Sequence, residues 1–149
     1  MVVLRKNINR EYMQLRVWQD ARELYLLTWK IFKRFPYELK RVASQQVASI
    51  DSIHRNIAEG YCRRGIKEYL QYLNIAMGSA GESVSAVHVY SPAGHISEEE
   101  FEQTDSLAFR LENGLKKLIE SLQEKQANND WDDSFVVKES NEIYGTSHE

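Results

Sequence analysis

Apolar residues recur every three or four positions along four long stretches of this chain, with polar residues between them. That spacing places the apolar side chains on one face of an α-helix. The predicted helices cover residues 15–35, 38–58, 66–90 and 97–126. Phe35 and Pro36 end the first helix, because proline forces the residue before it out of the α region. In the second helix the steps alternate between four and three residues, which is typical of the seam of a left-handed bundle.

Glycines divide and interrupt the second and third helices. The turn between them begins at Gly60, which we predict to be the C-cap of the second helix, and it closes at Gly65. Gly78 and Gly81 lie inside the third helix, where each glycine costs roughly 1 kcal/mol relative to alanine. We therefore expect another backbone to approach the third helix closely at these two positions.

The fourth helix has the most complete start signal. Ser97 and Glu100 have the spacing of a capping box, and Ile96 and Phe101 occupy the positions of a hydrophobic staple. Four amphipathic helices with short connections predict an all-α fold, an antiparallel up-down-up-down four-helix bundle over residues 12–127.

The two ends of the chain differ from the bundle in composition. Residues 1–11 are polar and basic without a clear period, and we expect a loose N-terminal arm there. Residues 128–149 form an acidic tail with six acidic residues and one lysine, a composition usual for disordered segments. The tail also contains apolar side chains that would allow it to dock against a basic surface of its own or a neighbouring subunit. These are Trp131, Phe135, Val136, Val137, Ile143 and Tyr144.

Composition and charge limit the class of protein. A chain of 149 residues with a net charge of −3 has the size of one domain. The single cysteine, Cys62, has no internal disulfide partner, and no signal peptide or membrane-spanning run is evident, so we expect a cytoplasmic protein. Residues 1–70 carry a charge of +7 and residues 71–149 a charge of −10. This asymmetry indicates either a basic face for a polyanion or complementary surfaces that meet within or between subunits.

Several motifs in the first three predicted helices are specific enough to indicate a family. They are L-x-V-W-Q-D-A at Leu15–Ala21, F-P at Phe35–Pro36, S-I-x-x-N-I-A-E-G at Ser52–Gly60, E-Y-L-Q-Y-L-N-I-A-M-G-S at Glu68–Ser79, and Glu82. Over Leu15–Leu122 the chain resembles the four-helix bundle family encoded by open reading frames within intervening sequences of bacterial 23S ribosomal RNA genes. Many members carry paired basic residues where this chain has Val47 and Ala48.

The resemblance implies an antiparallel four-helix bundle that assembles into a ring-shaped homopentamer. The genetic setting of the family implies a link to ribosomal RNA fragments. A distant bundle relative is the accessory protein of diversity-generating retroelements, which binds nucleic acid and a reverse transcriptase. The partners that the resemblance implies are therefore further copies of the chain, and RNA or an RNA-associated protein.

Polar residues stand near the predicted contact between the second and third helices, where a simple bundle would have leucine. They are Asn56, Glu59, Ser79 and Glu82. We expect a hydrogen-bonded network that sets helix register or a subunit contact, with Arg55, Arg63 or Arg64 pairing the carboxylates. The alternative is a polar site inside the bundle, in which the two carboxylates serve an enzyme.

Basic residues cluster around both predicted turns. The candidate nucleic-acid contacts are Arg55, Arg63, Arg64 and Lys67 around the second turn, and a further group around the first turn comprises Lys33, Arg34, Lys40 and Arg41. In an up-down bundle these groups lie at opposite ends, and Tyr61 or Tyr37 could add base stacking.

No pattern in the chain indicates catalysis, a metal or a cofactor. There is no Glu-x-x-His, no His-x-x-x-His, no phosphate-binding glycine loop and no nucleophile motif. The favoured interpretation is a non-enzymatic, oligomeric helical bundle acting as an interaction or ribonucleoprotein accessory module. The alternative is a structural or protein-binding homo-oligomer that does not bind nucleic acid.

Overall fold

A computed structural model describes residues 8–131, and this part of the chain contains helices and turns but no strand. The elements are η1 (Ile8–Gln14), α1 (Arg16–Phe32), η2 (Tyr37–Leu39), α2 (Lys40–Cys62), α3 (Ile66–Tyr90) and α4 (Glu98–Ala127), where η denotes a 3₁₀-helix. The all-α prediction with four long helices is confirmed.

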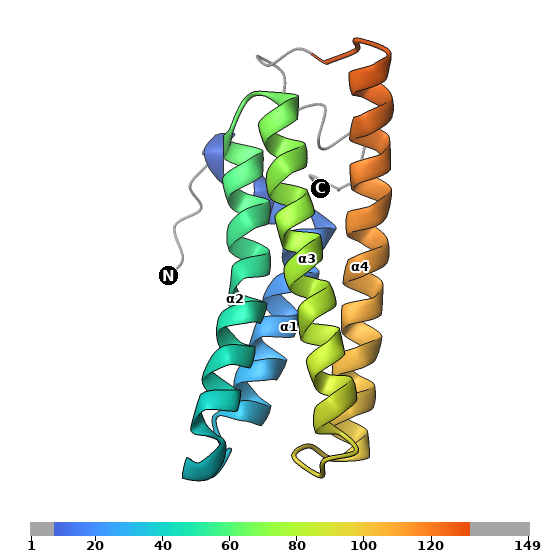
Figure 1. Cartoon of the computed structure of the whole chain (residues 1–149). Helices are drawn as coiled ribbons and strands as arrows, with labels where there is room; N and C mark the ends of the chain where they lie inside the picture. Colours follow the sequence, from blue (N-terminus) through green and yellow to red (C-terminus); the bar gives the residue numbers. More distant parts are fainter. Residues whose placement is uncertain (1–7, 132–149) are drawn as a thin grey trace.

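The four α-helices pack side by side as a bundle. Each packs against the next in sequence, and α1 also packs against α4. Figure 1 shows the α1–α2 and α3–α4 connections at one end and the α2–α3 turn at the other. We call the first the groove end, because a groove between α1 and α2 described below opens there. We call the second the turn end. The two groups of basic residues are therefore separated by the length of the bundle.

Apolar side chains from all four helices fill the centre of the bundle. Leu24, Ile53, Leu73 and Leu111 are fully buried in one cluster that runs along most of its length. A smaller cluster at the groove end is built around Phe32 and its neighbours. Burial of one such aliphatic side chain contributes about 1.5–3 kcal/mol, so these positions hold the helices together.

The prediction that Gly60 caps α2 is wrong. The helix continues to Cys62, and Gly60 lies buried inside it. A Cβ atom at Gly60 would lie 2.9 Å from Cβ of Tyr72 and 3.2 Å from the carbonyl oxygen of Tyr69 on α3. Glycine is therefore needed here for the close approach of two helices, not for a left-handed turn.

The close approach predicted at Gly78 and Gly81 is not found among residues 8–131. Both glycines are exposed, and a Cβ atom at either would have no neighbour within 4 Å. Within residues 8–131 the close approach of two helices lies at Gly60 instead. Periodicity does not distinguish a glycine that faces a neighbouring helix from one that faces outward.

The predicted start of α4 is confirmed. The Ser97 hydroxyl accepts from the backbone N–H of Glu100 at 3.0 Å, and the Glu100 carboxylate accepts from the N–H of Ser97 at 2.9 Å. Ile96 is buried in the smaller cluster, and Phe101 packs against the same cluster. Both parts of the start signal involve residues close in sequence, which is why sequence alone was sufficient.

The end of α4 turns the chain back onto the bundle. Asn129 has a φ of +57°, and the N–H of Asp130 donates to the carbonyl oxygen of Lys125 at 2.9 Å. This is the bonding of a Schellman motif, which needs a left-handed residue. The indole N–H of Trp131 then donates to the carbonyl oxygen of Arg64 at 3.2 Å, so the acidic segment begins at the turn end.

The expectation of a loose arm over residues 1–11 is wrong for residues 8–11. These residues belong to η1, which contacts α1 and α2. Tyr12 packs edge-on against Tyr61, with the ring centroids 6.2 Å apart. An aromatic anchor therefore holds a segment whose apolar residues are too few to show a period.

Candidate functional site

The contact between α2 and α3 contains a row of hydrogen-bonded polar side chains. The Ser52 hydroxyl donates to the Ser79 hydroxyl at 2.6 Å, and the hydroxyls of Ser49 and Ser83 lie 3.0 Å apart. The amide nitrogen of Gln46 donates to the carbonyl oxygen of Ser83 at 3.2 Å. We call these five residues the serine seam. Small side chains bring the two helices close together, and their polar atoms find partners across the contact.

Of the four predicted network residues, Ser79 bonds across this contact, whereas Asn56 bonds within α2. Ser79 is part of the serine seam, and Asn56 adjoins it by donating to the carbonyl oxygen of Ser52 at 2.7 Å. The two carboxylates lie elsewhere: Glu59 binds Arg63 at 3.1 Å, and Glu82 is exposed beside a shallow depression of about 450 Å³.

The two carboxylates are far apart along the bundle. Glu59 lies seven residues from Ser52 toward the turn end, and Glu82 lies three residues from Ser79 toward the groove end. Because Ser52 and Ser79 are in contact, the rise of an α-helix separates the two carboxylates by roughly 15 Å along the axis. Their separation does not suit a pair acting on one bond, for which roughly 5–10 Å is typical.

The charge of Arg55 is paired with an acidic side chain. Its Nε donates to Asp51 at 2.6 Å, and the imidazole of His54 lies 2.8 Å from the other carboxylate oxygen. Burial by itself raises the pKa of Asp51, but the hydrogen bonds from His54 and Arg55 and the arginine charge outweigh burial and lower the pKa overall. Arg55 also lies two helical turns from Arg63 and does not join the other candidate contacts.

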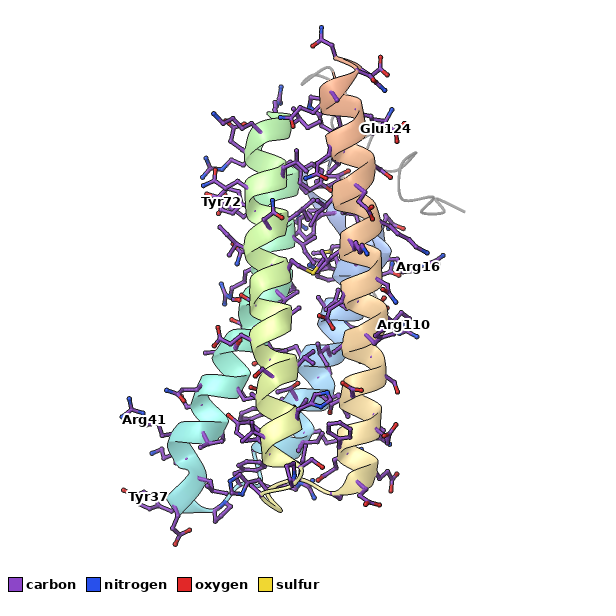
Figure 2. All side chains as sticks on the ribbon, turned by 45° about the vertical axis from the view of Figure 1, so that its right-hand side comes forward. Arg16, Tyr37, Arg41, Tyr72, Arg110 and Glu124 are labelled. Atoms are coloured by element: carbon purple, nitrogen blue, oxygen red, sulfur yellow. The ribbon has the colours of Figure 1, made fainter. Side chains whose placement is uncertain are left out.

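Arg63 is held on the surface of the α2–α3 hairpin. Its guanidinium lies 5.3 Å from the ring centroid of Tyr72 and donates to the Tyr72 hydroxyl at 3.2 Å. The hydrogen bond to Glu59 raises the pKa of Arg63, so the side chain stays charged. Tyr72 projects from α3 near the turn end (Figure 2). Arg63 is therefore fixed in position but partly neutralised by its acidic partner.

Arg64 and Lys67 differ from the other two candidates. Both side chains are exposed, one in the turn and one in the first turn of α3. Neither forms an ion pair with any residue between 8 and 131. Arg63, Arg64 and Lys67, which we call the turn cations, therefore form one small basic surface in which two cations have no ion-pair partner among residues 8–131, with the Glu68 carboxylate beside Gly65 as the nearby acidic group.

The basic residues at the groove end also differ in the groups that they contact. Arg34 forms an ion pair with Glu100, whereas the ammonium of Lys40 lies 5.9 Å from the ring centroid of Tyr37. Tyr37 is 84% exposed, and both Tyr37 and Arg41 point away from the bundle (Figure 2). Cations and exposed aromatic rings therefore adjoin at this end.

Sequence reasoning missed an ion pair between the buried Asp20 on α1 and the exposed Arg110 on α4. The Asp20 side chain is 8% exposed and accepts from Arg110 at 3.1 Å, while its second oxygen has no partner in the described chain. Asp20 lies three residues after Val17 and four before Leu24, so its place on the buried line was a usable signal. Loss of one partner would leave a buried charge uncompensated, which makes this pair structural.

The remaining reactive groups show no activated arrangement among residues 8–131. Burial is the main cause that raises the pKa of the Cys62 thiol, which disfavours the nucleophilic thiolate. No group of three His, Cys, Asp or Glu residues in that range is placed to hold a metal ion. None of the four α-helices in this range is long and apolar enough to cross a membrane.

All the candidate site residues described above fall within a match to a known family. The family model described as "23S rRNA-intervening sequence protein" matches residues 13–117. The chain belongs to this family. Comparison with curated proteins finds no match.

The 23S rRNA-intervening sequence protein family match covers the serine seam and the turn cations but not the acidic tail. Membership agrees with the helical bundle described above and confirms the resemblance inferred from the L-x-V-W-Q-D-A and N-I-A-E-G segments. The function of this member must be argued from its own surfaces.

Proposed function

We propose that this 23S rRNA-intervening sequence protein is a non-enzymatic, homo-oligomeric interaction module in the cytoplasm that contacts structured RNA through its turn end. The observation that carries the RNA contact is that Arg64 and Lys67, beside Arg63, are exposed and have no ion-pair partner among residues 8–131. Arginine and lysine at a protruding turn suit the phosphates of a folded RNA, which is read mostly through shape and backbone.

The absence of catalysis in this proposal is supported by the placement of the two carboxylates. Glu59 is neutralised by Arg63, and Glu82 is exposed roughly 15 Å away along the bundle axis. The depression beside Glu82 is lined by side chains of the serine seam, whose hydroxyls already bond to one another. The arrangement therefore favours a structural role for the polar residues of the α2–α3 hairpin.

The RNA contact is tested by salt-dependent binding to a structured RNA such as a ribosomal RNA hairpin. The full chain should bind at low salt, and the combined change Arg64→Ala and Lys67→Ala should weaken binding about tenfold. That change should also reduce the slope of log affinity against log salt by about two, one for each lost phosphate contact. Failure of the intact protein to bind at low salt would refute the RNA contact.

Arg55→Ala is the matched control for this experiment. It removes one arginine from α2, but the charge of that arginine is already compensated by Asp51. We expect the salt slope to stay within about half a unit of the intact protein. An equal loss from Arg55→Ala and Arg64→Ala would mean that binding reflects total charge and not the turn end.

A homo-oligomer without nucleic-acid binding is the second candidate, and the outward side of α3 supports the self-association that both candidates share. Gly78 and Gly81 are exposed there with nothing near them, while Ile75 and Val89 on the same helix are 45% and 61% exposed. Interior glycines weaken a helix, and no contact within residues 8–131 requires them. Close approach by a second copy would account for both the glycines and the exposed apolar residues.

The double change Gly78→Ala and Gly81→Ala tests whether a second copy packs against the outward side of α3. If this side of α3 meets solvent, the two changes should stabilise the protein by about 1 kcal/mol or more and leave its mass in solution unchanged. If another copy packs there, the added methyl groups should shift sedimentation toward smaller species. A wild-type protein that sediments as a monomer at all concentrations would refute the homo-oligomer.

A further inference from the structure

A groove between α1 and α2 at the groove end has a lining of apolar and aromatic side chains that remain partly exposed. Its volume is about 710 Å³, larger than the 450 Å³ depression near the serine seam. Trp29, Phe35 and Val47 contribute apolar surface, and Trp29 is 49% exposed although tryptophan is costly to leave in water. No other described segment of the chain covers this surface, so it is suited to an additional apolar segment.

The rim of the groove is basic. Lys33 and Lys40 line it from α1 and from the start of α2, and neither forms an ion pair among residues 8–131. The one acidic residue in the lining is Asp51, whose carboxylate is already bound by His54 and Arg55. The net field at the rim therefore favours an acidic ligand with apolar side chains.

The chain itself contains a segment of that chemistry. Asp132 and Asp133 precede Phe135, Val136 and Val137, and the segment follows directly on the described part of the chain. Two carboxylates match the two lysines of the rim, and three apolar side chains match the aromatic lining of the groove. The remaining apolar pair of the tail, at residues 143 and 144, follows Glu139 and Glu142, which are not adjacent as Asp132 and Asp133 are.

The length of the tail decides which copy it can reach. Trp131 is anchored at the turn end by its hydrogen bond to Arg64, and Val47 lies 17 residues before Arg64 along α2. The helical rise makes this distance about 25 Å, and Lys40 lies farther still at about 36 Å. The six residues from Trp131 to Val137 span at most about 21 Å when fully extended. Val137 can therefore reach only the near edge of the groove of its own chain, at Asp51, whereas Asp133, two residues and at most about 7 Å from Trp131, cannot meet Lys40 of its own chain.

We propose that residues 132–137 dock into the α1–α2 groove of a second copy of this chain. Phe135 and Val137 occupy the apolar lining, and Asp132 and Asp133 meet the lysines of the rim. The contact is independent of RNA binding and of the outward side of α3. It links copies tail to groove, and it shields Trp29 and Val47 from solvent.

A fluorescent peptide with the sequence of residues 130–138, D-W-D-D-S-F-V-V-K, tests the contact directly. The receptor is the full chain carrying Phe135→Ser and Val137→Ser, so that its own tail does not compete. Fluorescence anisotropy at low salt should show saturable binding that weakens as salt increases. Val47→Asp in the receptor should weaken binding tenfold or more, and Lys33→Ala with Lys40→Ala should weaken it several-fold.

Two controls show whether the contact is specific. Phe109→Ser removes another exposed aromatic residue, 65% exposed on α4 and outside the groove, and should leave binding unchanged. A peptide with both apolar changes should not bind. Absence of peptide binding, or equal losses from Val47→Asp and Phe109→Ser, would overturn the proposal. Circular dichroism of Val47→Asp shows that its helices are intact, and the lysine variant provides a second test.

Disulfide trapping distinguishes a second copy from the same copy. In a Cys62→Ser background, one preparation carries Ala48→Cys in the groove and a differently tagged one carries Ser134→Cys in the tail. Mixing them under mild oxidation should yield a mixed dimer, and Val47→Asp should reduce its yield. Cross-links confined to one chain when both cysteines are present together would overturn docking between copies. Loss of RNA binding would leave these results unchanged, so the two proposals fail separately.

Discussion

The two ends of the bundle carry similar numbers of basic residues but present them to solvent in different ways. At the turn end, three residues join α2 to α3, and the side chains of Arg64 and Lys67 are exposed there. At the groove end, Lys33 and Lys40 border an aromatic groove of about 710 Å³. The contrast shows that the neighbours of a cation, more than the local charge, determine which ligand it suits.

The largest expected effect on stability comes from adding side-chain atoms where α2 and α3 are in close contact at the turn end. Gly60→Val should lower the free energy of unfolding by about 3 kcal/mol, because its methyl groups meet the backbone of Tyr69 and Cβ of Tyr72. Urea denaturation followed by circular dichroism measures the change. A loss below about 0.5 kcal/mol would mean that the two helices separate without cost.

The next effect compares the two ends as RNA ligands. Arg64→Ala with Lys67→Ala should reduce the affinity for structured RNA about tenfold at low salt, whereas Lys33→Ala with Lys40→Ala should change it less than twofold. Both pairs remove two exposed cations that form no ion pair among residues 8–131. A larger loss of affinity from the pair at the groove end would contradict our proposal that RNA binds at the turn end.

A smaller effect concerns the start of α4, which forms part of the groove end. Ser97→Ala removes the hydroxyl that accepts from the N–H of Glu100, and should cost about 1 kcal/mol of stability. Ser97→Asp retains an acceptor and should restore most of the loss. Thermal unfolding of the three proteins gives the comparison, and no difference between alanine and aspartate would exclude capping as the cause.

The smallest effect is a dependence on pH at the edge of the groove. The pKa of Asp51 is lowered in the folded protein, so its contribution to stability is present at neutral pH and is lost as the pH falls through the folded pKa. Asp51→Asn should therefore cost a few tenths of a kcal/mol at pH 7, because the partners are partly solvated. The cost should begin to shrink as the pH falls below about 4 and should disappear once the pH is below the lowered pKa of the folded protein. Denaturant titrations of both proteins at pH 7 and pH 3 measure it, and an equal cost at both pH values would contradict an ionic contribution.

Much of the fold was predictable because its determinants are close in sequence. The capping box of Ser97 and Glu100 spans three residues, and buried Ile50, Ile53 and Ile57 follow one helical period. The predicted α3 also agrees with the observed Ile66–Tyr90. Local hydrogen bonds and side-chain periodicity act within a few turns, so a single sequence displays them.

The candidate site was less predictable because it depends on contacts between segments. The Asp51–Arg55 pair was readable from its spacing of four residues on one helix, but the Arg34–Glu100 and Asp20–Arg110 pairs join different helices and were not. The glycines at positions 60 and 78 look equivalent in sequence. Only the first faces another helix closely, and only the structure shows which one.

The sequence by itself determined that four helices form, where α4 begins, and which lines of apolar residues are buried. Tertiary structure decided which cations have no ion-pair partner among residues 8–131, which glycine is required by packing, and that Trp131 anchors the start of the tail at the turn end. The physical reason is range. Helix formation, capping and ion pairs such as Asp51–Arg55 are satisfied by neighbours in the chain, whereas pairs such as Arg34–Glu100 and the close packing at Gly60 depend on side chains that only folding brings together.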